Sequence, residues 1–183
     1  MVPQGNKMKS LCHGLKPPKD PLEGIHVAFS GVRKEFHDGL SARVAALRPN
    51  GPISGRFLSH NATVLVVGDS IFVHGGLLPE HVTYGLEKIN AEVSDWVKGS
   101  TVCRFPPSCC RGRNAVVWFK KFSEKVEAKC DFLTLDHVLD MIPSVKRMIM
   151  GHKIQKNGIN GVCDNKAIRI DVGMSKGCRG AFS

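Results

Sequence analysis

Two histidines at the ends of apolar segments are the first candidates for chemistry. His74 closes one apolar run and is followed by two glycines, and His152 follows a second apolar run through Gly151. The end of a strand lies at the rim of a sheet, where neighbouring glycines leave room for a metal ion or a phosphate to approach. Imidazoles at two such ends are suited to form half of a metal site. Hydrogen-bonded structural histidines are the alternative interpretation.

A loop with two arginines forms the second candidate group. Arg111 and Arg113 flank Gly112 ahead of an apolar run, and guanidinium groups bind phosphate oxygens through paired hydrogen bonds. A solvated basic loop is the alternative. Asp69, in a Gly-Asp-Ser sequence, is explained as a turn residue between two strands. No Walker-type or HExxH motif is present, and the residues alone assign no catalytic acid, base or nucleophile.

The segments that would position these residues combine helical and extended patterns. We expect helices over residues 35–47, 85–98 and 133–141, hairpins over 63–74 and 161–172, and strands over 115–119 and 147–150. Trp96 and Trp118 lie on apolar faces of such segments and are expected in the core. Hairpins mixed with separated helices predict an α/β (α+β) domain with layered architecture.

Length and composition fit one globular domain or part of a larger one. Of the 183 residues, 42% are hydrophobic, and 26 Lys+Arg against 16 Asp+Glu give a formal net charge of +10. No apolar run approaches the roughly 18 residues of a membrane-spanning helix, so no membrane partner is expected. The basic residues are scattered and Tyr occurs once, so the sequence predicts a solvated basic surface and no nucleic-acid partner.

The cysteines and the N-terminal segment indicate an intracellular protein. The seven cysteines include no CxxC pair, and the first twenty residues lack the apolar region of a secretory signal. We therefore expect a mostly reduced set of thiols and a cytoplasmic location. Cys103, Cys109 and Cys110 lie close together, and free loop thiols are favoured over a redox pair.

Two longer segments resemble a known enzyme family. VVGDSIFVHGGLLPEHVTYGLEKIN is similar to the HGG region of calcineurin-like, PPP-type metallophosphatases, and VKRMIMGHKIQKNGINGVCDNKAIRIDVGMSKGC is similar to their GH motif and closing hairpin. The sequence most resembles the plant Shewanella-like protein phosphatases, and the resemblance extends from about Cys12 to Cys178. The resemblance implies part of a β-sandwich flanked by helices over residues 35–178, after a loop-rich segment at 1–34 and before an irregular tail at 179–183.

The resemblance also implies a function and a set of site residues. Family members bind two divalent metal ions, commonly manganese, iron or zinc, which activate a water molecule to attack a phosphoester. His74 in HGG and His152 in GH match two metal ligands. Arg113 or Lys120 matches the residue that binds the substrate phosphate, although lysine lacks the paired donors of arginine. A phosphorylated protein is the implied substrate, and chloroplast or mitochondrion are alternative locations.

Three family motifs have no counterpart in the sequence. GDxHG, GDxxDRG and GNHE, which supply the carboxylate and asparagine ligands and the acid histidine, are absent from the 183 residues. We therefore expect the C-terminal portion of a catalytic domain, with at most a partial metal site, no catalytic acid and hydrolysis at or near background. A non-catalytic pseudo-phosphatase that binds a phosphopeptide or protein is the alternative function. The oligomeric state is not predicted.

Overall fold

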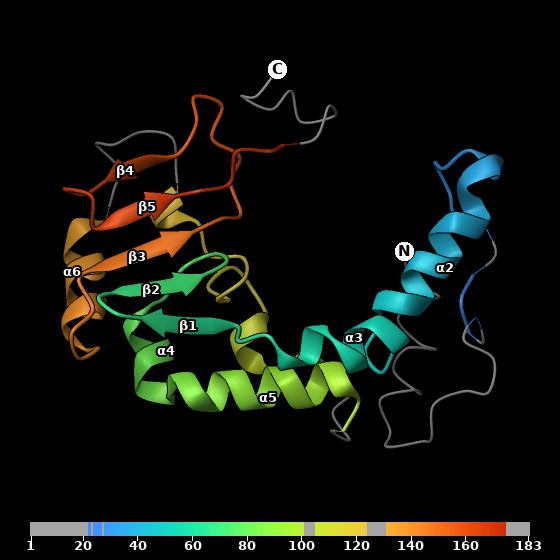
Figure 1. Ribbon diagram of the computed structural model, residues 1–183, viewed down its shortest axis with the longest axis horizontal. Coiled ribbons are helices and arrows are strands. Elements are labelled where there is room, and N and C mark those ends of the chain that lie inside the picture. The colour runs from blue at the N-terminus through green and yellow to red at the C-terminus, as the bar shows by residue number, and fades with distance from the viewer. Residues whose placement is uncertain (1–21, 23, 27, 101–104, 124–130, 175–183) are drawn as a thin grey trace. The chain divides into compact units, whose positions relative to one another are not determined.

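A computed structural model describes residues 22, 24–26, 28–100, 105–123 and 131–174 (Figure 1). The chain forms two compact units, one of residues 1–62 with 91–107 and one of residues 63–90 with 108–183. The predicted boundaries after residues 34 and 178 stay predictions, because much of the first segment and all of the tail lie outside the described residues. Within the described part of the chain, no helix has the length and apolar character needed to cross a membrane.

The first unit is helical in its described part. It contains η1 (Lys34–Phe36), α2 (His37–Leu47), α3 (Pro52–Arg56), η2 (Leu58–His60) and the second half of α5 (Leu86–Lys98). The predicted helices at 35–47 and 85–98 are confirmed. Two hydrogen bonds tie this unit together: Asn50 N–H donates to the Val97 carbonyl at 2.9 Å, and Ser94 Oγ donates to the Ser59 carbonyl at 2.7 Å.

The second unit contains a five-stranded mixed sheet in the order β1-β2-β3-β5-β4 (Figure 1). Its strands are β1 (Val64–Val67), β2 (Ser70–Val73), β3 (Arg147–Met150), β4 (Asn160–Val162) and β5 (Ala167–Arg169). The pairs β1–β2 and β4–β5 are antiparallel hairpins, whereas β2–β3 and β3–β5 are parallel. Both predicted hairpins, the strand at 147–150 and the α/β class are therefore confirmed.

One face of the sheet forms the core of this unit. Strand side chains alternate between faces, and Ile71, Val73, Met148, Met150 and Ala167 on one face are 5% exposed or less. Three side chains of helix α6 (Phe132–Asp140) are also buried. The strand sequences are short and rich in β-branched residues, which suits a pleated surface that is covered on at least one side.

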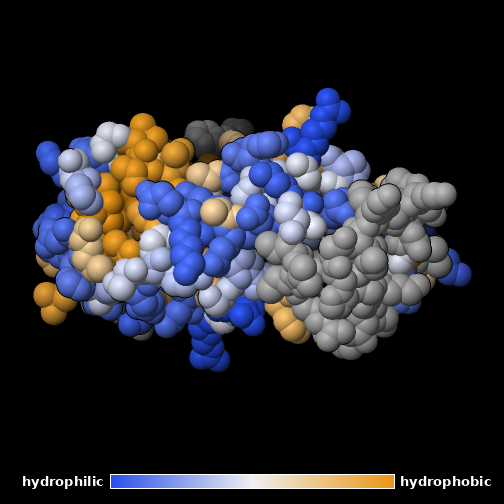
Figure 2. Space-filling model, turned by 90° about the horizontal axis from the view of Figure 1, so that it is seen from below, coloured by the Kyte–Doolittle hydropathy of each residue, from blue (hydrophilic) through white to orange (hydrophobic). Residues whose placement is uncertain are grey.

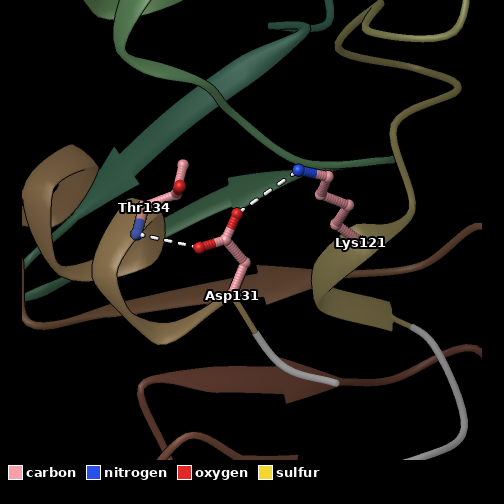
Figure 3. A network of polar contacts seen from close by, with 3 residues as sticks. All are labelled: Lys121, Asp131 and Thr134. Atoms are coloured by element: carbon pink, nitrogen blue, oxygen red, sulfur yellow. Dashed lines mark hydrogen bonds and ion pairs between the residues drawn. The ribbon is translucent and has the colours of Figure 1, made fainter.

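Helix α6 begins at a carboxylate cap. The Asp131 carboxylate accepts a hydrogen bond from the Thr134 N–H at 3.3 Å and pairs with Lys121 Nζ at 3.4 Å (Figure 3). An aspartate at this position satisfies an N–H of the first turn that the helix itself leaves unpaired. Hydrogen bonding from Thr134, supported by Lys121, lowers the pKa of Asp131 below its usual 3.8. The cap confirms the helix predicted at 133–141 and fixes its start.

The strand predicted at 115–119 is wrong. These residues form turns in which the N–H groups of Trp118 and Phe119 both donate to the Ala115 carbonyl, at 2.9 and 2.8 Å. Ala115, Val116 and Phe119 are nevertheless buried, so the apolar run predicted burial correctly. Trp118 is 59% exposed, which overturns its expected place in the core. A short apolar run does not by itself distinguish a strand from another buried segment.

Candidate functional site

Parallel pairing of β2 and β3 brings the two predicted histidines together. Val73 and Met150 are register partners at the ends of these strands, so the residues that follow them meet at one sheet edge. The Gly151 N–H donates to the His74 carbonyl at 3.0 Å. The rings of His74 and His152 lie edge to face, with centroids 5.3 Å apart. The prediction that each histidine lies at a strand end is confirmed, and the parallel pairing adds that both lie at one rim of the sheet.

Glycines allow the chain to turn tightly beside these histidines. The N–H groups of Gly75 and Gly76 donate to the Val116 carbonyl at 2.8 and 3.2 Å. A Cβ at Gly75 would lie 2.8 Å from that same oxygen and 2.9 Å from the Phe119 carbonyl oxygen. Gly76 has φ 155°, which side chains disfavour. The glycines therefore hold the segment 115–119 against the end of β2.

Trp118 joins that segment to the histidine pair. Its ring lies edge to face with the His152 ring, at a centroid distance of 5.3 Å. His152 itself has φ 66°, an uncommon backbone conformation for a residue with a side chain. Trp118 is a site residue that the sequence analysis missed. No local sequence pattern pointed to its contact with His152.

Both predicted phosphate-binding residues line one open pocket of about 870 Å³. Arg113, Lys120 and Lys121 bring three positive charges to it, and Trp118 forms part of its wall. Lys121 pairs with Asp131. Among the described residues, no carboxylate lies within ion-pair distance of Arg113 or Lys120. Arg111, the other arginine of the predicted clamp, does not line this pocket.

The environment of His152 favours its neutral form. Burial lowers the pKa of His152 below its usual 6.5, and the nearby His74 and Lys120 lower it further, while Asp171 opposes them. A neutral imidazole keeps a lone pair on one ring nitrogen, which is the form that binds a metal ion. The effect of Lys120 on His152 also places the basic pocket and the histidine pair in one electrostatic environment.

The histidine pair fits part of a metal site. Two imidazoles on one tetrahedral ion, with metal–nitrogen distances of about 2.1 Å, place their ring centroids about 5 Å apart, close to the 5.3 Å observed. Such ions take roughly four to six ligands. Within the described ranges, no group of three or more His, Cys, Asp or Glu side chains is arranged to hold a metal ion. The described residues therefore fit two positions of a coordination shell and do not complete it.

The remaining candidates have structural roles. Asp69 lies in the β1–β2 turn as predicted, and its carboxylate pairs with Arg147 at 3.1 Å. The Cys109 and Cys110 sulfurs are 4.0 Å apart and are not joined in a disulfide. Cys163 is disulfide-bonded, so the cysteines expected to be mostly reduced include one that is oxidised. Cys103 lies outside the described residues.

Comparison with known proteins agrees with the sequence motifs. The chain is 63% identical over 174 residues to Shewanella-like protein phosphatase 2 of Arabidopsis thaliana, and the match covers 95% of this chain. This chain is related to the Shewanella-like protein phosphatases. It spans 44% of the length of that relative. No protein family model matches the chain.

Solved structures of phosphatases share the fold. A variant of a cold-active protein tyrosine phosphatase superposes with a TM-score of 0.60 at 19% identity, over 92% of this chain and 48% of its own. The cold-active protein-tyrosine phosphatase of a psychrophilic Shewanella species gives a TM-score of 0.57 at 20% identity, over 78% of this chain and 44% of its own. These likenesses support the α/β fold of this chain.

Proposed function

We propose that the chain is part of the catalytic domain of a metal-dependent phosphoprotein phosphatase. The observation that carries the proposal is the histidine pair at the ends of β2 and β3, with ring centroids 5.3 Å apart, beside a pocket lined by Arg113 and Lys120. A metal-binding edge next to a positively charged pocket suits a phosphate monoester, because the phosphate carries the opposite charge. The family relationship supports the same reaction class.

The chain's own residues would bind and orient the phosphate. Arg113 offers paired N–H donors to two phosphate oxygens, and Lys120 adds a single charged donor from the same pocket. His74 and His152 would together hold one divalent ion of a two-ion centre, each through a ring nitrogen. When bound, two such ions neutralise the phosphate and lower the pKa of the attacking water. The described residues do not complete that centre, so we expect hydrolysis by the chain alone at or near background.

The substrate class follows from the names of the related proteins. The Arabidopsis relative is named a protein phosphatase and the solved neighbours are named protein tyrosine phosphatases. We propose a phosphorylated protein as the substrate of the complete enzyme to which this chain would contribute. The exposed Trp118 at the pocket wall would lie beside the residue that carries the phosphate.

Metal binding by the histidine pair is tested by calorimetric titration of the chain with Zn²⁺ and Mn²⁺. We expect one weak site, and we expect His74→Ala or His152→Ala to lower its affinity by about tenfold or more. His137→Ala is the matched control, because His137 is an exposed histidine on α6 in the same unit. Equal affinities in the wild type and both site variants would contradict the assignment of these ligands.

Phosphate binding is tested in the same protein with orthophosphate and a phosphopeptide. Arg113→Ala is expected to weaken binding by about tenfold, in the range for loss of a charged hydrogen-bonding group. Arg111→Ala is the matched control. It removes the same charge two residues earlier in the sequence, but the Arg111 side chain does not line the pocket. If the two variants lose affinity equally, general charge and not the pocket binds phosphate.

A binding module without catalysis is the second candidate function. It is favoured by the incomplete ligand set of the described residues and by the basic pocket, which needs no metal to attract phosphate. Titration of the phosphopeptide in the presence of a chelator separates the two functions. Undiminished binding in chelator supports the module, whereas loss of binding in chelator supports a metal-dependent site.

A further inference from the structure

The ring of His152 has few contacts that fix its orientation. His152 lies in a turn after β3, with φ 66° and with the Lys153 N–H donating to the Gly151 carbonyl at 2.8 Å. A histidine that binds a metal ion usually donates its second ring N–H to a carboxylate or carbonyl, which fixes the ring. Within the described ranges, no hydrogen bond reaches a ring nitrogen of His152, and the nearby Asp171 carboxylate accepts from the Gly173 N–H instead. The orientation of the ring therefore depends on its other contacts.

Trp118 supplies such a contact. The centroids of the Trp118 and His152 rings are 5.3 Å apart and their planes are 86° apart, which is the edge-to-face arrangement that aromatic rings favour. The ring of His74 also contacts His152, at 5.3 Å and 72°. Because His74 is itself a proposed ligand, Trp118 is the neighbour that can orient His152 without binding the ion.

Packing in the core does not account for the position of Trp118. Its side chain is 59% exposed, whereas Val116 and Phe119 in the same turn are 3% exposed or less. Exposure alone does not single it out, because many large apolar side chains of this chain are exposed, and Figure 2 shows apolar side chains gathered in one area of the surface. The feature that distinguishes Trp118 is the histidine ring that it contacts.

The turn that carries Trp118 is anchored to the end of the strand that precedes His74. The Trp118 N–H donates to the Ala115 carbonyl at 2.9 Å, which closes the turn. The Val116 carbonyl accepts at 2.8 Å from the N–H of Gly75, the residue after His74. Both hydrogen bonds join backbone atoms, so the turn keeps its place at the end of β2 whatever the nearby side chains do.

We infer that Trp118 is a positioning residue, whose indole ring holds His152 in the orientation in which His74 and His152 bind one divalent ion. The inference rests on the metal site of the proposed function and adds an orienting contact to it. Trp118 is not a ligand, because the indole N–H is a donor only. Its aromatic contact takes the place of the hydrogen bond that usually orients a metal-binding histidine.

Titration of the 183-residue chain with Zn²⁺ tests this role. Trp118→Leu keeps an apolar side chain but removes the ring, and we expect it to weaken Zn²⁺ binding by about tenfold, as for the loss of other orienting partners. Trp118→Phe keeps an aromatic ring and is expected to bind within about twofold of the wild type. Tyr84→Leu is the matched control, because it removes an exposed aromatic ring that contacts Lys88 in the same unit.

The visible absorption of bound Co²⁺ provides a second readout. At saturating Co²⁺ the spectrum reports the ligands and their geometry and no longer depends on affinity. We expect the spectra of the wild type, Trp118→Phe and Tyr84→Leu to coincide, and that of Trp118→Leu to change as His152 leaves its orientation. A role in stability alone would not change the spectrum, and circular dichroism verifies that each variant is folded.

Three results would overturn the positioning role. They are a wild-type Zn²⁺ affinity in Trp118→Leu, an equal loss in Trp118→Phe and Trp118→Leu, and an equal loss in Tyr84→Leu and Trp118→Leu. His74→Ala and His152→Ala, measured alongside, separate this inference from the proposed function. If these two lose affinity and Trp118→Leu does not, only the positioning role fails. If neither loses affinity, the proposed metal site fails and the positioning role fails with it.

Discussion

Gly75 lies where the end of β2 meets the segment 115–119, and replacing it with alanine would disturb that contact. The added Cβ would lie 2.8 Å from the Val116 carbonyl oxygen, 2.9 Å from the Phe119 carbonyl oxygen and 3.0 Å from the Phe119 nitrogen. All three are backbone atoms, so no side-chain rotation relieves the contact. The segment that carries Trp118 would have to move away from the sheet edge.

The cost follows from packing and hydrogen bonding. Overpacking in a well-packed interior costs about 1–3 kcal/mol. Movement of Val116 also lengthens the hydrogen bonds that its carbonyl accepts from Gly75 and Gly76, each with a net contribution of about 1 kcal/mol. Alanine offsets about 0.4–1 kcal/mol of this cost, because it lowers the conformational entropy of the unfolded chain. We therefore expect Gly75→Ala to lower the free energy of unfolding by about 2 kcal/mol.

Urea unfolding followed by tryptophan fluorescence measures this effect. The chain has two tryptophans, so Trp96→Phe leaves Trp118 as a reporter in the unit that contains Gly75. Gly151→Ala is the matched control, because its Cβ would lie 3.5 Å or more from His74 atoms, in ordinary contact. A free energy of unfolding for Gly75→Ala within about 0.5 kcal/mol of the control, well inside the usual scatter of mild substitutions, would refute the steric argument.

Three further predictions concern stability. Asp131→Ala removes the cap of α6 (Figure 3) and should cost about 1 kcal/mol in urea unfolding; an unchanged midpoint would show that the cap contributes nothing. Met148 is fully buried in β3, so Met148→Ala should lower the free energy of unfolding by about 2–5 kcal/mol. A smaller decrease would mean that the core collapses around the cavity. The pKa of His81 is lowered below 6.5 by burial, and its Nδ1 accepts from the Leu78 N–H at 3.0 Å. The folded state therefore binds fewer protons, so stability should be fully present above pH 6.5 and fall as the pH drops through that value towards the folded pKa. His81→Asn, which keeps an acceptor but does not titrate, should reduce this dependence, and equal pH profiles of the two proteins would contradict it.

Local sequence patterns predicted most of the elements. The helix at α2, the hairpin of β1 and β2, and helix α6 follow from apolar spacing and turn residues, which act over a few residues. These signals need no knowledge of the rest of the chain. The same reasoning located His74 and His152 at strand ends, because each follows an apolar run and adjoins glycine.

The segment 115–119 shows where local reasoning fails. Its five apolar residues resemble a buried strand, yet the Val116 carbonyl accepts hydrogen bonds from Gly75 and Gly76, about 40 residues earlier. A strand needs the edge of another strand to pair with its backbone groups. Here the neighbouring segment is the turn at Gly75 and Gly76, and residues 115–119 form a turn against it. The exposure of Trp118 and its contact with His152 follow from that arrangement and had no local signature.

The sequence by itself determined the residue types, the motifs and the family relationship, and with them the choice of His74, His152, Arg113 and Lys120. The tertiary structure decided that β2 and β3 pair in parallel, although 73 residues separate the end of one from the start of the other. Parallel pairing places both histidines at one edge, whereas antiparallel pairing would place them at opposite ends of the sheet. It also decided that one apolar face of the sheet is buried, whereas Leu65 and Phe72 on the other face are 49% and 37% exposed. Register and layer covering depend on contacts between distant segments, which local patterns do not encode.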